Sequence, residues 1–238
     1  MHKILIKSLL CLIVIVQSAI AQNSSGVILI KHTNDFDLNG QGKNKAWDAA
    51  SWNLMMPSEK GDLRKTQFKV LYSDKGIYFL FHNEDRLLTA TKTADYEKLW
   101  LEDVIEVFLW PDTTETLYFE YEISPLNYEL PLLIPNLNGT FFGWIPWQYD
   151  GVRKVVHYTN VTGGEKKSGS KITSWDAEFF IPFKLMVPLS NVPPKSGTTW
   201  RGNMYRIDYD APTTVRWHWK PVETNFHQFS KFGVLLFE

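Results

Sequence analysis

Short strand-like runs separated by turn residues recur along this sequence, and they constrain its fold more than any other feature. Residues 68–72 and 77–81 are two such runs, and Asp74 and Gly76 between them have the turn chemistry of a hairpin. Helical periodicity is scarce. Short strands at this spacing predict an all-β fold, an antiparallel β-sandwich of two packed sheets similar to immunoglobulin or jelly-roll domains. The predicted strands are 27–32, 66–73, 77–83, 104–109, 116–124, 152–159, 173–181, 200–208, 215–220 and 234–237.

The first residues have the pattern of a secretory signal peptide. Lys3 and Lys7 give a positive start, residues 9–16 form an apolar run, and residues 19–21 read Ala-Ile-Ala, a small-x-small cleavage site. We therefore predict that residues 1–21 are removed on export and that the protein is secreted or periplasmic. The apolar run is too short to span a bilayer, so we expect no membrane insertion after cleavage.

The composition of the rest of the chain narrows the classes of function. The chain is long enough for one large domain or two small ones, and because no linker divides residues 22–238 we expect them to form a single domain. Cys11 is the only cysteine and lies in the predicted signal peptide, so we expect no disulfide, cysteine nucleophile or cysteine-based metal site in the mature protein. The net charge of −1 gives no reason to expect nucleic acid as a partner.

One stretch, residues 100–108, combines an aromatic ring with a carboxylate on a strand. Side chains alternate along a strand, so Glu106 shares one face with Val104 and Phe108. A carboxylate in such an apolar strand needs water, a partner or a ligand. A ring such as Trp100 beside a carboxylate is what a sugar-binding site needs, because the ring covers the C–H face of a sugar and the carboxylate accepts from its hydroxyls. The alternative is that Trp100 packs in the core and that Glu106 is a charge that prevents an edge strand from pairing with another chain.

Further carboxylates belong to the next predicted strand. Glu120 and Glu122 share a face with Tyr118 and could join Glu106 to form an acidic strip on one sheet. Such a strip could bind an ion, pair with Arg206, or accept hydrogen bonds from sugar hydroxyls.

Several stretches follow one another in a recognisable order. They are residues 46–52 (Ala-Trp-Asp-Ala-Ala-Ser-Trp), the hairpin 70–81, residues 100–108 (Trp-x-x-Asp-x-x-Glu-Val-Phe), 118–125, 175–178 with 181–183, 200–203 with Arg206, and 229–233. Together they cover nearly all of the mature chain and resemble carbohydrate-binding module family 9 and its stand-alone relatives. The resemblance implies an antiparallel β-sandwich, in agreement with the strand pattern.

The resemblance also implies a site that binds an oligosaccharide or polysaccharide. Trp100 and Phe226 match the two rings that hold a sugar, although the family usually has Trp where this chain has Phe226. Glu106 matches the carboxylate that contacts the sugar, and Arg206 matches a polar residue on a late strand. Glu122 falls where the family has an arginine, a reversal of charge. Some family members carry structural calcium, whose ligands the resemblance does not place in this chain.

The residues leave three other functions open. Glu106, Glu120 and Glu122 could supply the paired carboxylates of a hydrolase or lyase, although no nucleophile motif accompanies them. Related sandwich folds bind haem, but this chain has no c-type haem motif. A sandwich that has lost its sugar site would be an interaction protein. We favour carbohydrate binding without catalysis.

Other notable side chains are expected to be structural. Asp103 should cap a turn or bind an ion. Residues 126–149 are predicted as a long loop whose Trp144 and Trp147 extend a binding surface or cap the sandwich. The tryptophans expected in the core are Trp47, Trp52, Trp175 and Trp200.

Overall fold

The structure is a computed structural model that describes residues 26–59, 62, 64–137, 140–147, 149–210 and 214–238. The predicted signal peptide, residues 1–21, lies outside the described residues. The described residues form fourteen β-strands and four short 3-10 helices. None of the described helices is long and apolar enough to cross a membrane.

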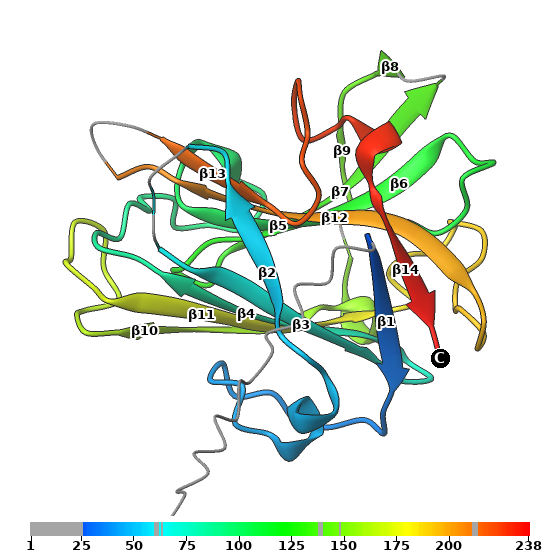
Figure 1. Ribbon diagram of the computed structural model, residues 1–238, viewed down its shortest axis with the longest axis horizontal. Coiled ribbons are helices and arrows are strands. Elements are labelled where there is room, and N and C mark those ends of the chain that lie inside the picture. Colours follow the sequence, from blue (N-terminus) through cyan, green and yellow to red (C-terminus); the bar gives the residue numbers. More distant parts are fainter. Residues whose placement is uncertain (1–25, 60–61, 63, 138–139, 148, 211–213) are drawn as a thin grey trace, which may run out of the picture.

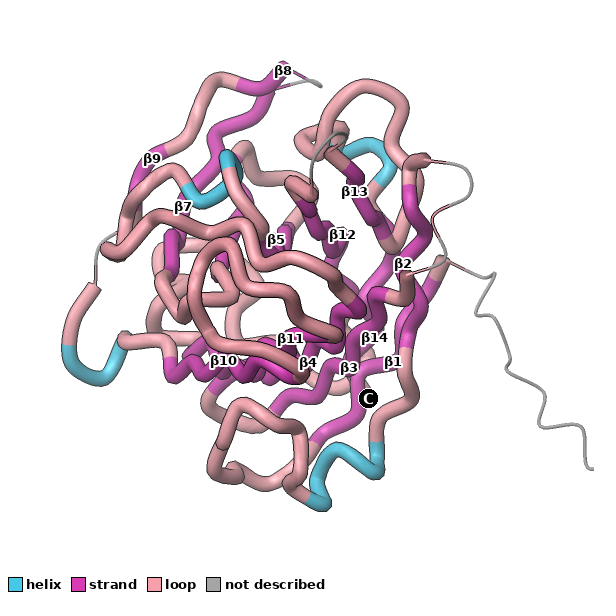
Figure 2. Tube along the Cα trace, turned by 90° about the vertical axis from the view of Figure 1, so that its left-hand side faces the viewer, coloured by secondary structure: helices cyan, strands magenta, loops and turns pink. Residues whose placement is uncertain are grey.

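The strands form two layers that pack face to face, which we call the upper and lower sheets as they lie in Figure 1. The view in Figure 2 again separates β5 and β12 of the upper sheet from β3, β4, β10 and β11 of the lower sheet, with loops covering the near end. The upper sheet contains, in order, β14 (Gly233–Phe237), β12 (Thr199–Asp208), β5 (Val104–Trp110), β6 (Leu117–Ile123) and β7 (Glu129–Leu137). β13 (Val215–His218) pairs with the second half of β12. Two short strands, β8 (Thr140–Phe141) and β9 (Ile145–Pro146), pair with β7. The lower sheet contains β3 (Thr66–Tyr72), β4 (Gly76–Glu84), β11 (Ser174–Pro182) and β10 (Val156–Thr162).

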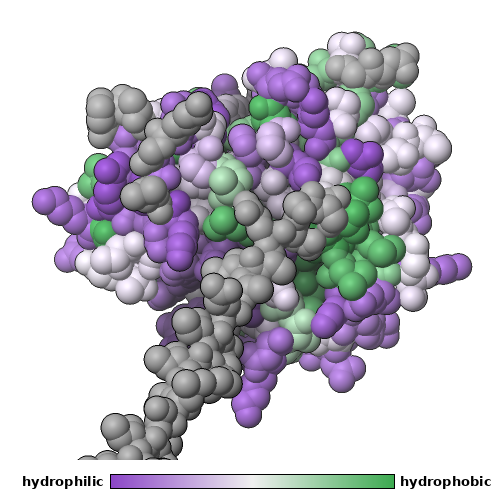
Figure 3. All heavy atoms as spheres, in the orientation of Figure 1, coloured by the Kyte–Doolittle hydropathy of each residue, from purple (hydrophilic) through white to green (hydrophobic). Residues whose placement is uncertain are grey.

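Two strands pass from one sheet to the other. The first half of β1 (Val27–His32) pairs with β14 and its last two residues pair with β3. β2 (Asn53–Pro57) pairs first with β3 and then with β13. We call these two crossings the seam. Figure 3 shows apolar side chains gathered over β1 and β14, where Leu29 is 48% exposed. The predicted β-sandwich is confirmed, but both pairings of β1 are parallel, so the sandwich is not purely antiparallel.

The strand β5 shows how the sequence pattern produces the core. Ile105 and Val107 point into the apolar core between the two sheets. Val104 and Phe108 point the other way and belong to a second apolar cluster on the outer face of the upper sheet. Glu106 shares this outer face, as the period-two pattern predicts.

Four strands were not expected from the sequence. β2 lies in a stretch with no clear alternation, and β7, β8 and β9 lie inside the predicted loop 126–149. Pro131 and Pro135 interrupt β7, and proline is typical of strands near a sheet edge. In the same region Trp147 packs against the core and its indole N–H donates to the Leu185 carbonyl oxygen (2.8 Å).

A buried carboxylate fixes the segment that covers the lower sheet. Glu178 lies on β11 and is fully buried. Its Oε2 accepts from the backbone N–H groups of Asn39 (2.9 Å) and Gly40 (2.6 Å), and its Oε1 accepts from the Trp47 indole N–H (2.7 Å). Gly40 has a positive φ of 76°, a conformation that favours glycine. The Gly42 N–H adds a longer bond to Oε2 (3.4 Å), so one carboxylate binds four donors of residues 36–50 at once.

Candidate ligand-binding cavity

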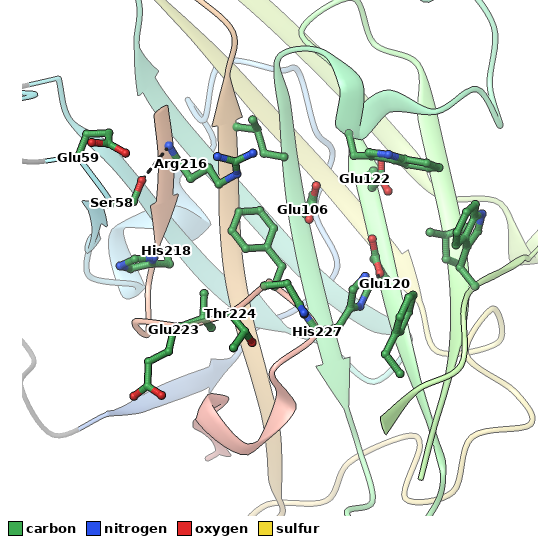
Figure 4. Close-up of a pocket in the computed structure, with 18 residues that line it drawn as sticks. Ser58, Glu59, Glu106, Glu120, Glu122, Arg216, His218, Glu223, Thr224 and His227 are labelled. Atoms are coloured by element: carbon green, nitrogen blue, oxygen red, sulfur yellow. Dashed lines mark hydrogen bonds and ion pairs between the residues drawn. The ribbon is translucent and has the colours of Figure 1, made fainter. Parts of the chain in front are cut away.

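An open cavity of about 720 Å³ lies on the outer face of the upper sheet (Figure 4). Strands form its floor, and the loops before β5, around β8 and after β13 form its rim. Floor residues are Glu106 on β5, Glu120 and Glu122 on β6, Leu132 on β7, Ile207 on β12, and Arg216 and His218 on β13. Rim residues include Trp100, Phe141, Trp144, Phe226 and His227.

Three carboxyl groups lie together on the cavity floor, as Figure 4 shows for Glu106, Glu120 and Glu122. Glu106 pairs directly with Glu122 across β5 and β6, and Glu120 lies two residues before Glu122 on the same face. Their side chains are only 1–3% exposed. Like charges at directly opposed positions repel, so this arrangement opposes the simultaneous ionisation of the three groups. The structure thus brings together the predicted acidic strip.

Burial dominates the protonation of these groups. It raises the pKa of Glu120 to about 8, although a hydrogen bond with Glu122 acts in the opposite direction. Burial, followed by the charges of neighbouring carboxylates, raises the pKa of Glu106 and of Glu122 well above the usual value. Glu120 Oε2 and Glu122 Oε2 have no hydrogen-bond partner within the described part of the chain. Apart from a proton shared between the two carboxyl groups, these buried oxygens on the cavity floor therefore have no donor among the described residues.

Trp100 is held at the rim by its neighbours. It lies in a 3-10 helix, Leu99–Leu101, which Leu99 anchors in the outer apolar cluster. The Tyr209 hydroxyl donates to the Trp100 carbonyl oxygen (2.7 Å). The indole meets Trp144 edge to face, with ring centroids 5.2 Å apart. The site therefore has two indoles at one end, of which the sequence indicated Trp100 as the sugar-contacting one.

Phe226 is positioned by Tyr205. The two rings are stacked with centroids 3.9 Å apart and planes 9° apart. The Tyr205 hydroxyl also donates to the Phe226 carbonyl oxygen (2.9 Å). One face of the Phe226 ring is thus covered by Tyr205, and the ring lines the cavity with its remaining surface.

The expectation that Arg206 contacts the ligand is wrong, because Arg206 points away from the cavity. It is fully buried, pairs with Asp208 (2.6 Å) and Asp85 (3.0 Å), and lies 4.5 Å from the centre of the Trp217 ring. Side chains alternate along β12, so Tyr205 faces the outer side and Arg206 the interior. Arg206 therefore belongs to the packing between the sheets.

Arg216 is the arginine that lines the cavity. It lies on β13 opposite Ile207 of β12 and is exposed. Its charge acts to lower the pKa of Glu106, although burial has the larger effect. The sequence predicted this strand, but only the pairing of β13 with β12 shows which of its side chains face the cavity.

His227 is a second lining residue that the sequence did not single out. Its Nδ1 lies 2.7 Å from the Tyr118 hydroxyl and 3.9 Å from Glu120 Oε2, and its ring stacks on Phe141 at 4.0 Å. Burial lowers the pKa of His227 to about 4. Near pH 7 the imidazole is therefore neutral and forms no ion pair with Glu120, despite the short distance.

A group of aspartates elsewhere in the described chain could in principle hold a cation. Carboxylate oxygens of Asp85, Asp208 and Asp210 lie within 4.8 Å of one another. However, Arg64 Nη1 donates to Asp208 Oδ2 (2.7 Å) and Asp210 Oδ2 (3.0 Å), and Arg206 Nη2 donates to the same Asp208 oxygen. Guanidinium groups already pair with all three aspartates, so the cluster fits a buried ion-pair network.

The remaining predicted structural residues divide into two groups. Asp103 is fully buried and accepts from the backbone N–H groups of Thr89 (2.6 Å) and Tyr209 (2.8 Å), which is a structural role. The expectation for Trp52 is wrong, because this side chain is 42% exposed just before β2. The tryptophans that lie in the core as expected are Trp47, Trp175 and Trp200.

Comparison with known proteins identifies the family to which this geometry belongs. The profile of carbohydrate-binding family 9 matches residues 49–237. The chain belongs to carbohydrate-binding family 9. The resemblance in the sequence motifs is thereby confirmed. No curated protein sequence matches this family 9 protein.

Solved structures share the fold of this family 9 protein. A Bacteroides uniformis protein to which carbohydrate binding is ascribed superposes with a TM-score of 0.74 and 17% identity, covering 89% of this chain and 99% of that one. A family 9 module from Caldicellulosiruptor kristjanssonii in complex with cellotriose gives a TM-score of 0.63 and 17% identity, covering 89% and 93% of the two chains. A family 9 module from the same organism in complex with glucose gives a TM-score of 0.62 and 17% identity, covering 89% of this chain and 95% of that one.

Proposed function

We propose that this family 9 protein binds carbohydrate in the cavity and does not transform it. The observation behind the proposal is the cavity itself, which combines aromatic rings and buried carboxyl groups from separate parts of the chain. Rings stack on the C–H faces of sugars, and carboxyl groups bind their hydroxyls. Family membership and the neighbours in complex with cellotriose and glucose support the proposal.

In the proposed complex, Trp100 and Phe226 stack on a sugar ring and Glu106 accepts hydrogen bonds from its hydroxyls. Phe226 offers the surface that Tyr205 leaves uncovered. Glu122, directly opposite Glu106, supplies a second carboxyl group. Arg216, which lines the cavity, takes the donor role that the sequence assigned to Arg206.

We infer binding instead of hydrolysis from the protonation of the carboxyl groups. A glycosidase needs one carboxyl that keeps its proton and another that is ionised. Burial raises the pKa of Glu106, Glu120 and Glu122 alike, and all three lie on two adjacent strands of one floor. Release of shorter products from an oligosaccharide mixture would contradict this inference.

Replacing Trp100 by alanine tests the proposal. A sugar that stacks on the indole should lose at least about tenfold in affinity, because ring contact and area burial are both removed. Trp52→Ala is the matched control, since Trp52 is similarly large, partly exposed and remote from the cavity lining. Isothermal titration with cellotriose and a broad glycan panel gives the affinities, and circular dichroism checks the fold.

The two tryptophan variants distinguish the remaining functions. Binding by the wild type that only Trp100→Ala weakens supports the proposed site. Binding that both variants retain would contradict the role of Trp100. A folded wild type that binds no glycan of the panel would favour the interaction-protein alternative, in which the fold persists without a sugar site.

We also propose that the protein is exported. The support is the charged, apolar and small-residue pattern of residues 1–21, which precede the family match. The mature protein recovered from an exporting host should begin at Gln22 in N-terminal sequencing. A product that retains Met1 would contradict cleavage.

A further inference from the structure

The cavity has an unusual excess of acidic groups. Five carboxyl side chains line it, and Arg216 is the one lysine or arginine among the described lining residues. Both lining histidines, His218 and His227, have pKa values lowered by burial, so they add little positive charge near neutral pH. The acidic lining residues are Glu59, Glu106, Glu120, Glu122 and Glu223.

Three of these groups are buried at the floor, and their oxygens need donors. Glu120 Oε2 and Glu122 Oε2 have no hydrogen-bond partner among the described residues, and Glu106 lies directly opposite Glu122. Buried polar groups in native proteins are normally paired, so orphaned acceptors on a cavity wall indicate the chemistry of a missing ligand. That ligand must bring several donors to one small region.

A primary ammonium group matches this demand. It offers three N–H donors and a positive charge at a single atom, whereas a hydroxyl offers one donor and no charge. It would also neutralise part of the repulsion between Glu106, Glu120 and Glu122. The indoles of Trp100 and Trp144 at the rim of the same cavity attract cations through their faces.

We propose that the preferred ligand is a saccharide carrying a protonated amine, such as a glucosamine residue, whose ammonium group lies among Glu106, Glu120 and Glu122. This inference rests on the proposed carbohydrate binding and adds the chemical class of the sugar.

Binding of an ammonium group should release protons. In the ligand-free cavity burial raises the pKa of the three floor carboxyls, and a bound cation favours their ionised forms. Affinity for the amine therefore increases as pH rises toward about 8, the pKa of Glu120 in the ligand-free protein, until the amine itself loses its proton, by up to about tenfold per pH unit for each proton released. Other titratable or charged groups facing the floor carboxyls are Glu59, Tyr118, Tyr205, Tyr209, Arg216, His218, Glu223 and His227.

Three oligosaccharides with the same β-1,4 backbone test the inference by titration calorimetry at about pH 6. They are trimers of glucosamine, N-acetylglucosamine and glucose, which differ at one substituent. We expect the glucosamine trimer to bind at least about tenfold more tightly than the other two. Glu122→Gln should reduce this ratio by about tenfold, and Glu165→Gln, an exposed site away from the cavity with the same charge change, should leave it unchanged.

Each outcome has a distinct meaning. If the glucose or N-acetylglucosamine trimer binds as tightly as the glucosamine trimer, the amine preference is wrong and carbohydrate binding stands. If trilysine binds as tightly as the glucosamine trimer, the attraction is one of charge alone and the inference is overturned. If no trimer and no member of a broad glycan panel binds the folded protein, the proposed function itself fails.

Discussion

Two arginines on neighbouring strands of the upper sheet have opposite surroundings. Arg206 is fully buried against Asp85 and Asp208, whereas Arg216 is exposed and lines the cavity. A buried charge that loses its partner is costly, while an exposed charge can be removed with little effect on stability. A substitution at Arg206 should therefore affect the stability of the fold, and a substitution at Arg216 should affect ligand binding.

Substituting each arginine by glutamine measures this difference. Arg206→Gln should lower the free energy of unfolding by about 3–5 kcal/mol, because the buried Asp85 loses its ion pair with Arg206 and Asp208 loses one of its two guanidinium partners. Arg216→Gln should change the free energy of unfolding by no more than about 0.5 kcal/mol. It should still weaken glycan binding by up to about tenfold. Urea denaturation and titration calorimetry give the two quantities, and the reverse pattern would contradict the placement of these side chains.

At the scale of the strands, the sequence predicts which side chains share a face, because this depends on alternation along one strand. It does not predict features that depend on which strands pair with one another. The faces of β5 follow from its period-two pattern, and so does the joint placement of Glu106, Glu120 and Glu122 on one outer face. The prolines of β7 concealed a strand, because they break the local propensity and are tolerated near an edge. That Arg216 lines the cavity and Arg206 does not could not be predicted from the sequence, because it depends on how β12 and β13 align with β5.

The segment 36–50 provides a test at the same scale. Glu178→Gln keeps the shape of the side chain but replaces one carboxylate oxygen by a donor that faces other donors. We expect a loss of about 2–4 kcal/mol in the free energy of unfolding and faster amide hydrogen exchange at Gly40. Glu165→Gln is the control with the same charge change on an exposed side chain. Unaltered exchange at Gly40 would contradict the anchoring role of Glu178.

For the whole molecule, the floor carboxyls couple stability to pH. Glu120 holds its proton more tightly in the folded state, where its pKa is about 8, than in the unfolded chain, where it is about 4.5. Its stabilising contribution is therefore complete below about pH 4.5 and is lost as pH rises through about 8. His227 acts oppositely, because its pKa falls from 6.5 to about 4 and its contribution is lost as pH falls through that range.

Comparing Glu120→Gln with the wild type isolates the carboxyl contribution. The melting temperature of the ligand-free wild type should fall relative to that of the variant between about pH 5 and about pH 8.5, by several degrees. Differential scanning calorimetry in the absence of glycan measures this difference. Parallel melting curves across the range would show that the pKa of Glu120 is not raised.

The seam fixes the order in which the molecule can be assembled. β1 lies beside β14, although the two strands are separated by almost the full length of the described chain. During synthesis β14 leaves the ribosome after all the other described strands, so β1 has no β14 to pair with until then. The join between the two sheets along β1 therefore cannot be complete until β14 has been made, and a chain that is passed through a membrane during synthesis can complete this join only on the far side.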